Sequence, residues 1–248
     1  MNNEFAELKK AVVEQSNMIR PYCGPVFFTS SLGSAIGTIP ANGSFGLVDA
    51  GEKKLLVTCY HVWDAFEKLH GANPELRMLV CLDENAPVVV DPRHFIDQNE
   101  QLDIATFDMA ALLERCGGRK FYELNQNPAP SVAKGDSLFF VGYPGWFRSA
   151  NEEGVQFGRL CFRMGVSDVS GFFFIADVSK TVGFDGDWKR AVYPDEKAYP
   201  GISGSPCFLR QGRDVRLVGF TTSVVLDFLR FTHVHCLNTD GTIKKLRC

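Results

Sequence analysis

After Pro21 the sequence consists of short apolar runs rich in Val, Phe, Ile and Thr, separated by Gly, Pro, Asn and Asp. Runs of this length are typical of β-strands, and the residues between them are typical of turns. The pattern predicts an all-β fold. We expect strands at 24–29, 34–39, 45–49, 53–58, 76–82, 87–91, 103–108, 137–142, 155–165, 171–178, 206–210 and 215–224.

Two other segments organise the chain into domains. Apolar residues at positions 5, 8, 12 and 13 are near helical spacing, which predicts an amphipathic helix within 1–20. We expect it to pack on the outside of a β-domain, with docking on a partner as the less favoured alternative. Residues 125–133 are rich in Asn and Pro and indicate a linker, so we expect β-domains at 21–128 and 129–248.

A serine flanked by glycines lies in the segment P-G-I-S-G-S-P at 200–206. A serine hydroxyl is a weak nucleophile at neutral pH, so catalysis would need a histidine base and a carboxylate that orients it. Both occur upstream, as His61 after an apolar run and as Asp103 in L-D-I-A. Taken one at a time, the serine could simply lie in a turn, the histidine at the end of a strand, and the aspartate in a turn or at a helix cap. Together, and in this order along the chain, the three residues favour a catalytic role.

The segments T-C-Y-H-V, L-D-I-A and P-G-I-S-G-S-P resemble the three catalytic blocks of trypsin-like serine peptidases, which have the chymotrypsin fold. Segments 134–144 and 217–224 resemble two further strands of that family, and the five blocks follow in the family's order. The resemblance implies two antiparallel Greek-key β-barrels preceded by a short N-terminal helix. His61 and Asp103 would lie on the first barrel and Ser203 on the second.

The resemblance also implies roles for the site residues. His61 would be the general base, Asp103 would orient it, and Ser203 would attack a peptide carbonyl to form an acyl-enzyme. The backbone N–H groups of Gly201 and Ser203 would bind the oxyanion. The hydroxyl of Thr222 would support Asp103. The expected activity is therefore that of a serine endopeptidase.

Further positions concern substrate choice and activation. By resemblance, Lys197, Tyr199 and Val224 are candidates for substrate binding; a lysine would favour acidic side chains and a valine small ones. Ile202 stands where zymogens of the family carry an aspartate that pairs with a new N-terminus, so we expect no activation by that route. Ser205 replaces a glycine, as in bacterial-type members of the family.

Composition limits the partners. The net charge is only −3 and no basic cluster occurs, which argues against nucleic acid or an anionic membrane as partner. We expect a protein or peptide substrate, a regulatory or assembly partner, and no cofactor. We also expect no metal, because the eight cysteines form no C-x-x-C pair and the histidines of 233–235 suit strand packing. Residues 1–19 lack the apolar core of a secretory signal, which predicts a cytoplasmic protein with reduced thiols.

Two other functions remain open at this point. The chain could be a protease-like module that binds peptides without cutting them, although such a binder needs neither a full triad nor Gly201. A serine esterase of the α/β-hydrolase type is less favoured. The segment 204–248 is too short for the strands and helices that follow the nucleophile in that fold.

Overall fold

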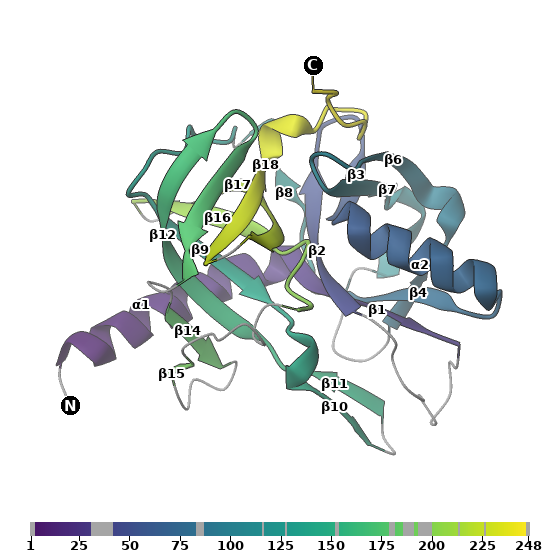
Figure 1. Ribbon diagram of the computed structural model, residues 1–248, viewed down its shortest axis with the longest axis horizontal. Coiled ribbons are helices and arrows are strands. Elements are labelled where there is room, and N and C mark those ends of the chain that lie inside the picture. The colour runs from purple at the N-terminus through teal and green to yellow at the C-terminus, as the bar shows by residue number, and fades with distance from the viewer. Residues whose placement is uncertain are drawn as a thin grey trace.

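The computed structural model describes residues 3–30, 42–82, 87–115, 117–126, 128–151, 154–178, 182–185, 191–192, 200–212, 214–225 and 227–246. The predicted strand at 34–39 lies outside these residues. The described chain folds into two large β-sheets that lie side by side, with one helix at the N-terminus and a second on the first sheet (Figure 1).

The first sheet has the strand order β5-β4-β1-β2-β3-β7-β6, with β8 beside β2. Its edge strands β5 and β6 do not pair with each other in the part of the chain that is described, so the sheet is a half-barrel. A half-barrel still fits the two-barrel arrangement that we expected, and the Greek-key connections remain a prediction. The strands are β1 (Cys23–Thr29), β2 (Asn42–Asp49), β3 (Lys54–Thr58), β4 (Arg77–Cys81), β5 (Pro87–Val90), β6 (Phe95–Asn99), β7 (Ile104–Asp108) and β8 (Tyr122–Glu123).

A helix that we did not expect, α2 (Tyr60–Ala72), packs against this half-barrel. Its buried residues Val62, Trp63 and Phe66 recur at helical spacing. The Trp63 ring stacks on Phe95 with centroids 5.3 Å apart, so α2 shields apolar side chains that a closed barrel would have shielded. The helix also changes the position of His61, which lies in its first turn and not on a strand.

The second sheet closes into a six-stranded barrel, because β13 pairs with both β18 and β12 in the order β13-β18-β17-β16-β9-β12. Phenylalanines fill it: Phe140 stacks on Phe162 at 4.6 Å, and Phe174 on Phe231 at 5.0 Å. The expected strand at 155–165 is two strands. The barrel sheet comprises β9 (Ser137–Gly142), β12 (Leu160–Ser170), β13 (Phe173–Asp177), β14 (Val182–Asp185), β15 (Ala191–Val192), β16 (Pro206–Gln211), β17 (Asp214–Val225) and β18 (Phe228–His233). A separate two-stranded sheet is formed by β10 (Arg148–Asn151) and β11 (Gly154–Phe157).

The N-terminal helix α1 (Asn3–Ile19) packs against β9 and β12 on the outside of the barrel, which confirms the predicted packing. Val12 and Ile19 are buried there, and the Ser16 hydroxyl lies 2.9 Å from the Cys161 sulfur. The short helical turns are η1 (Arg20–Tyr22), η2 (Pro92–His94), η3 (Ala110–Arg115), η4 (Gly145–Phe147) and η7 (Val234–Cys236). Within the described residues, neither α-helix is long and apolar enough to span a membrane.

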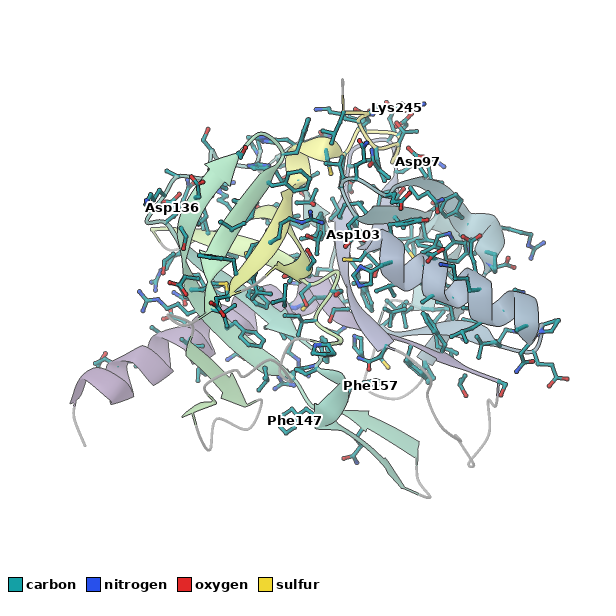
Figure 2. The ribbon with its side chains drawn as sticks, viewed as in Figure 1. Asp97, Asp103, Asp136, Phe147, Phe157 and Lys245 are labelled. Atoms are coloured by element: carbon teal, nitrogen blue, oxygen red, sulfur yellow. The ribbon has the colours of Figure 1, made fainter. Side chains whose placement is uncertain are left out.

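The C-terminal residues return to the first sheet after the barrel is complete. The Ile243 N–H donates to the Asp97 carboxylate at 2.8 Å, and the Thr106 hydroxyl donates to the Gly241 carbonyl at 2.8 Å. Figure 2 shows Asp97 and Lys245 close together on this edge, and Asp103 between the two sheets. The end of the chain thereby ties the two sheets together. The domain boundaries at 20 and 128 remain predictions.

We expect His233, whose ring centroid lies 4.1 Å from that of His235, to make stability depend on pH. Burial, reinforced by His235, lowers the pKa of His233 from 6.5 to about 4. Between these values the unfolded chain binds the proton and the folded chain does not, so stability is lost as the pH falls. We expect a loss of at most about 3 kcal/mol across this window. Urea unfolding at several pH values measures it.

The matched control is His233→Asn, whose side-chain oxygen can still accept from the His235 N–H, as the imidazole does at 3.2 Å. This variant cannot titrate and should lose most of the slope between about pH 4 and 6.5. An unchanged slope would assign the pH dependence to other groups.

Candidate active site

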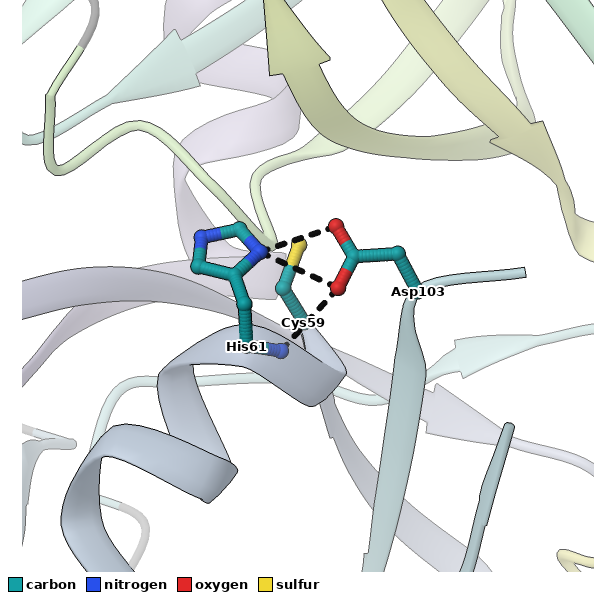
Figure 3. Close-up of side chains that lie close together, drawn as sticks. All are labelled: Cys59, His61 and Asp103. Carbon is teal, nitrogen blue, oxygen red and sulfur yellow. Dashed lines mark hydrogen bonds and ion pairs between the residues drawn. The ribbon is translucent and has the colours of Figure 1, made fainter. Parts of the chain in front are cut away.

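His61 and Asp103 form a hydrogen-bonded pair between the two sheets (Figure 3). The His61 Nδ1 lies 2.9 Å and 3.0 Å from the two carboxylate oxygens, and the His61 backbone N–H donates to Oδ1 at 3.0 Å. That N–H belongs to the first turn of α2, where helix N–H groups lack an intrahelical acceptor. One carboxylate thus satisfies the helix terminus and orients the imidazole. With the proton on Nδ1, the Nε2 atom is left as a base.

The two side chains differ in exposure. The Asp103 side chain is 9% exposed and that of His61 is 50% exposed. Burial of the carboxylate lowers the local dielectric constant and so strengthens its interaction with the imidazole. Because the imidazole is half exposed, its outer edge is open to a reactant.

Asp103 has an uncommon backbone conformation, with a φ of 54°, the only positive value among the non-glycine residues described. Aspartate tolerates the left-handed region better than most residues, yet strain of order 1–3 kcal/mol remains. The turn is held by its neighbours: the Asp103 N–H donates to the Glu100 carbonyl at 3.2 Å, and the Thr232 hydroxyl of β18 donates to the Leu102 carbonyl at 2.5 Å. The second barrel therefore helps to fix the carboxylate on the first sheet.

Ser203 lies in the loop before β16, at the boundary with the first sheet. Its carbonyl accepts from the Ser44 N–H at 2.7 Å, and its hydroxyl donates to the Thr222 carbonyl at 3.4 Å. Among the residues described, Ser203 makes no hydrogen bond to His61. Catalytic hydrogen bonds are often long before substrate binds. The structure thus brings His61 and Asp103 into direct contact and places Ser203 at the same boundary.

Two glycines give the loop its shape. Gly201 has a φ of 99° and Gly204 a φ of 91°, both in the region that favours glycine. Between them, Ile202 is 1% exposed and packs into the barrel core against Gly142. In the described part of the chain, the amide N–H groups of Gly201 and Ser203 donate to no protein acceptor.

Sequence reasoning missed the residues that clamp this loop from the first sheet. The Ser44 hydroxyl donates to the Gly201 carbonyl at 2.9 Å. The Asn42 amide donates to the Tyr143 carbonyl at 2.9 Å, and the nearby Gly145 N–H donates to the Pro200 carbonyl of the loop at 2.8 Å. Ser44 is fully buried. These contacts fix the candidate oxyanion loop in one orientation. The sequence offered one signal, since N-G-S at 42–44 is polar within an otherwise apolar strand.

Cys59 is a second residue that the sequence analysis did not assign to the site. Its thiol donates to the Thr221 carbonyl at 3.2 Å, and the Gly204 N–H donates to the same carbonyl at 2.8 Å. Thr221 therefore links the residue before α2 to the loop that carries Ser203. Burial, reinforced by Asp103, raises the pKa of Cys59 well above its ordinary value, so the thiol is neutral.

The remaining predicted residues are placed differently. The Thr222 hydroxyl donates to the Arg230 carbonyl of β18 at 3.1 Å, which differs from the expected contact with Asp103. Thr222 lies where the register of the β17–β18 pair shifts. Val224 is 42% exposed on β17. Arg230, which we did not predict, lies over the Phe173 ring at 5.0 Å and donates to the Thr222 hydroxyl at 3.4 Å. Lys197 and Tyr199 lie outside the described residues.

Replacement of Gly204 by alanine tests the loop. A methyl group there would overlap the Ser44 carbonyl and lie 2.8 Å from the Thr58 hydroxyl, and the positive φ adds strain. We expect the free energy of unfolding to fall by roughly 1–3 kcal/mol. Any activity should fall about 100-fold, because the loop must move. Gly165→Ala is the control: an added methyl there meets nothing within 4 Å, so stability should hardly change. Equal effects from both would refute this role of Gly204.

No protein-family model matches this chain, and no curated protein matches it in sequence. The comparison with solved structures finds a serine protease. The crystal structure of AL20, a thermostable serine protease from an extremophilic microorganism, matches with a TM-score of 0.50 over 86% of this chain and 91% of that chain. The sequence identity is 13%. At this identity the likeness shows the fold, and a closed barrel beside a half-barrel sheet fits the chymotrypsin-like arrangement.

Proposed function

We propose that this chain is a serine endopeptidase that cleaves protein or peptide substrates through His61, Asp103 and Ser203. One observation carries the proposal: the His61 Nδ1 lies 2.9 Å from a buried carboxylate at the boundary that also bears the Ser203 loop. This pairing suits an imidazole that must take a proton at Nε2 and be stabilised when charged.

The reaction proposed is acyl transfer in two steps. His61 Nε2 takes the proton of the Ser203 hydroxyl as its oxygen attacks the peptide carbonyl carbon, and it then protonates the leaving amine. Water, activated by the same imidazole, hydrolyses the acyl-enzyme. The N–H groups of Gly201 and Ser203 stabilise the oxyanion, and each such donor is worth about 100- to 1000-fold in kcat.

The free edge of β17 supports a peptide as substrate. Residues 214–220 of β17 pair with β16, whereas residues 223–225 pair only with β18 in the described structure. An extended peptide would add to the open edge as a further strand, and its side chains would alternate between the protein and solvent. Val224 contributes to substrate selection in this proposal, while the roles of Lys197 and Tyr199 remain predictions.

The proposal also covers how the peptidase becomes active and in which cell compartment it works. Ile202 is already packed in the barrel core, so the loop needs no ion pair with a new N-terminus. The six cysteines that the structure describes form no disulfide with one another, which suits a reducing compartment such as the cytoplasm. Ser205 supports placement in a bacterial-type branch of the family.

A fluorophosphonate probe tests the proposal, because it phosphonylates a serine only when a base activates its hydroxyl. We expect the wild-type chain to be labelled on the tryptic peptide that contains Ser203, and Ser203→Ala to remain unlabelled. Absence of labelling in the wild type, with and without added peptides, would reject the enzyme.

A peptide-binding module without activity is the second candidate. It is favoured by the Ser203 hydroxyl, which donates to the Thr222 carbonyl at 3.4 Å instead of to His61. Such a module would bind extended peptides at the β17 edge, would not be labelled by the probe, and would release no cleavage product.

A further inference from the structure

A group of side chains suited to a metal ion lies within the candidate active site. The Cys59 Sγ, the His61 Nδ1 and a carboxylate oxygen of Asp103 all lie within 4.8 Å of one another. Figure 3 shows the sulfur beside both the imidazole and the carboxylate. It is the one such group of three found among the described residues. His61 and Asp103 serve the proposed reaction, but Cys59 has no part in it.

We propose that Cys59, His61 and Asp103 form a binding site for a borderline-soft divalent cation such as Zn²⁺. Thiolate, imidazole and carboxylate are the three side-chain ligands that zinc takes in proteins. Three protein ligands would leave the fourth tetrahedral position to water. Hard cations such as Mg²⁺ and Ca²⁺ prefer all-oxygen sites and would bind poorly.

The distances are compatible with this site after small side-chain movements. A tetrahedral zinc ion keeps such ligand atoms about 3.2–3.6 Å apart, given metal–ligand bonds of about 2.0–2.3 Å. The His61 Nδ1 and the Asp103 oxygens already lie 2.9–3.0 Å apart, and the separations to the sulfur are at most 4.8 Å. Rotation of the Cys59 thiol away from the Thr221 carbonyl can close the remaining gap.

The charges and protons balance when the metal binds. The Cys59 thiol loses its proton to solvent, and the imidazole moves its proton from Nδ1 to Nε2 so that Nδ1 can coordinate the metal. One thiolate and one carboxylate then neutralise the two positive charges of the ion. A neutral complex is far less costly to bury than an isolated ion.

The ion would enter at the exposed side of His61, because the His61 side chain is 50% exposed whereas Cys59 is fully buried. Binding would break the hydrogen bond from His61 Nδ1 to Asp103 and leave Nε2 protonated. If the proposed peptidase function holds, the metal-bound form cannot take the proton of Ser203. The cation would then act as a reversible inhibitor.

Binding of Co²⁺ to the full-length Ser203→Ala protein tests the site without any need for activity. Co²⁺ replaces Zn²⁺ in such sites and absorbs through thiolate charge transfer when sulfur is a ligand. We expect this absorption in the Ser203→Ala protein. When Cys59→Ala is added, the absorption should disappear and the affinity for Co²⁺ should be at least about 100-fold weaker. Cys59→Ser keeps the side-chain volume and should likewise lose the absorption.

The matched control is Cys81→Ala, because Cys81 is the most exposed of the described cysteines and therefore the first to bind a metal nonspecifically. The absorption should persist in this variant. Its loss there, its persistence in Cys59→Ala, or its absence from the Ser203→Ala protein would each overturn the site.

Inhibition separates this proposal from the proposed function. In a chain with Ser203 intact, Zn²⁺ should abolish peptide cleavage, EDTA should restore it, and Mg²⁺ should have no effect. Cys59→Ala, measured relative to its own metal-free rate, should need at least about 100-fold more Zn²⁺. Equal sensitivity of the variant and the wild type would refute the Cys59 ligand. A chain without activity that still shows the cobalt absorption would reject the peptidase and keep the metal site.

Discussion

Replacement of Ser203 by alanine should lower kcat for peptide cleavage by roughly a million-fold and leave the fold intact. The nucleophile is removed, whereas the backbone bond from Ser44 N–H to the Ser203 carbonyl does not depend on the side chain. Removal of a catalytic serine has an effect of about this size, and the residual rate comes from oxyanion stabilisation and binding. The measurement combines single-turnover peptide cleavage with thermal unfolding.

Ser205→Ala is the matched control. The Ser205 hydroxyl is fully buried and has no hydrogen-bond partner in the described structure. Its removal should change neither kcat nor the midpoint of unfolding appreciably, because no hydrogen bond is lost. If Ser203→Ala retained activity, or if Ser205→Ala lost as much, the assignment of the nucleophile would be wrong.

Replacement of Asp103 by asparagine should lower kcat by about 10,000-fold. The amide oxygen can still accept from the His61 backbone N–H, which lies 3.0 Å from Oδ1, so the first turn of α2 keeps its partner. The amide NH₂ would then face Nδ1 and force the imidazole proton onto Nε2. An imidazole in that tautomer cannot accept the proton of Ser203. KM should change far less than kcat.

Asp97→Asn controls for the loss of one negative charge on the same sheet. The Asp97 carboxylate accepts from the Gln98 N–H at 2.9 Å and from the Ile243 N–H at 2.8 Å, and an amide oxygen can keep one of these two bonds. We expect its kcat to stay within about tenfold of the wild type, because this group touches no candidate catalytic atom. A loss of less than about tenfold in Asp103→Asn would contradict the role of Asp103, since a wrong tautomer is far more damaging.

Local patterns predicted most of the strands, but they missed the strands β6 and β18 and the helix α2. The run at 53–58 is a strand as expected, but α2 follows it, and its apolar positions 62, 63 and 66 were the signal that was missed. The half-barrel was not predictable from such patterns. Closure depends on whether two edge strands distant in sequence meet, and short-range periodicity carries no information on that contact.

The site divides in the same way. By itself, the sequence determined the residue types and their order: a histidine after an apolar run, an aspartate before an apolar run, and a serine between two glycines. Only the tertiary structure decided that His61 meets Asp103 at 2.9 Å, that Ser44 clamps Gly201, and that the Cys59 sulfur lies beside both candidate catalytic groups. The physical reason is that these contacts join segments far apart in the chain, so they exist only once the half-barrel, α2 and the closed barrel have packed together.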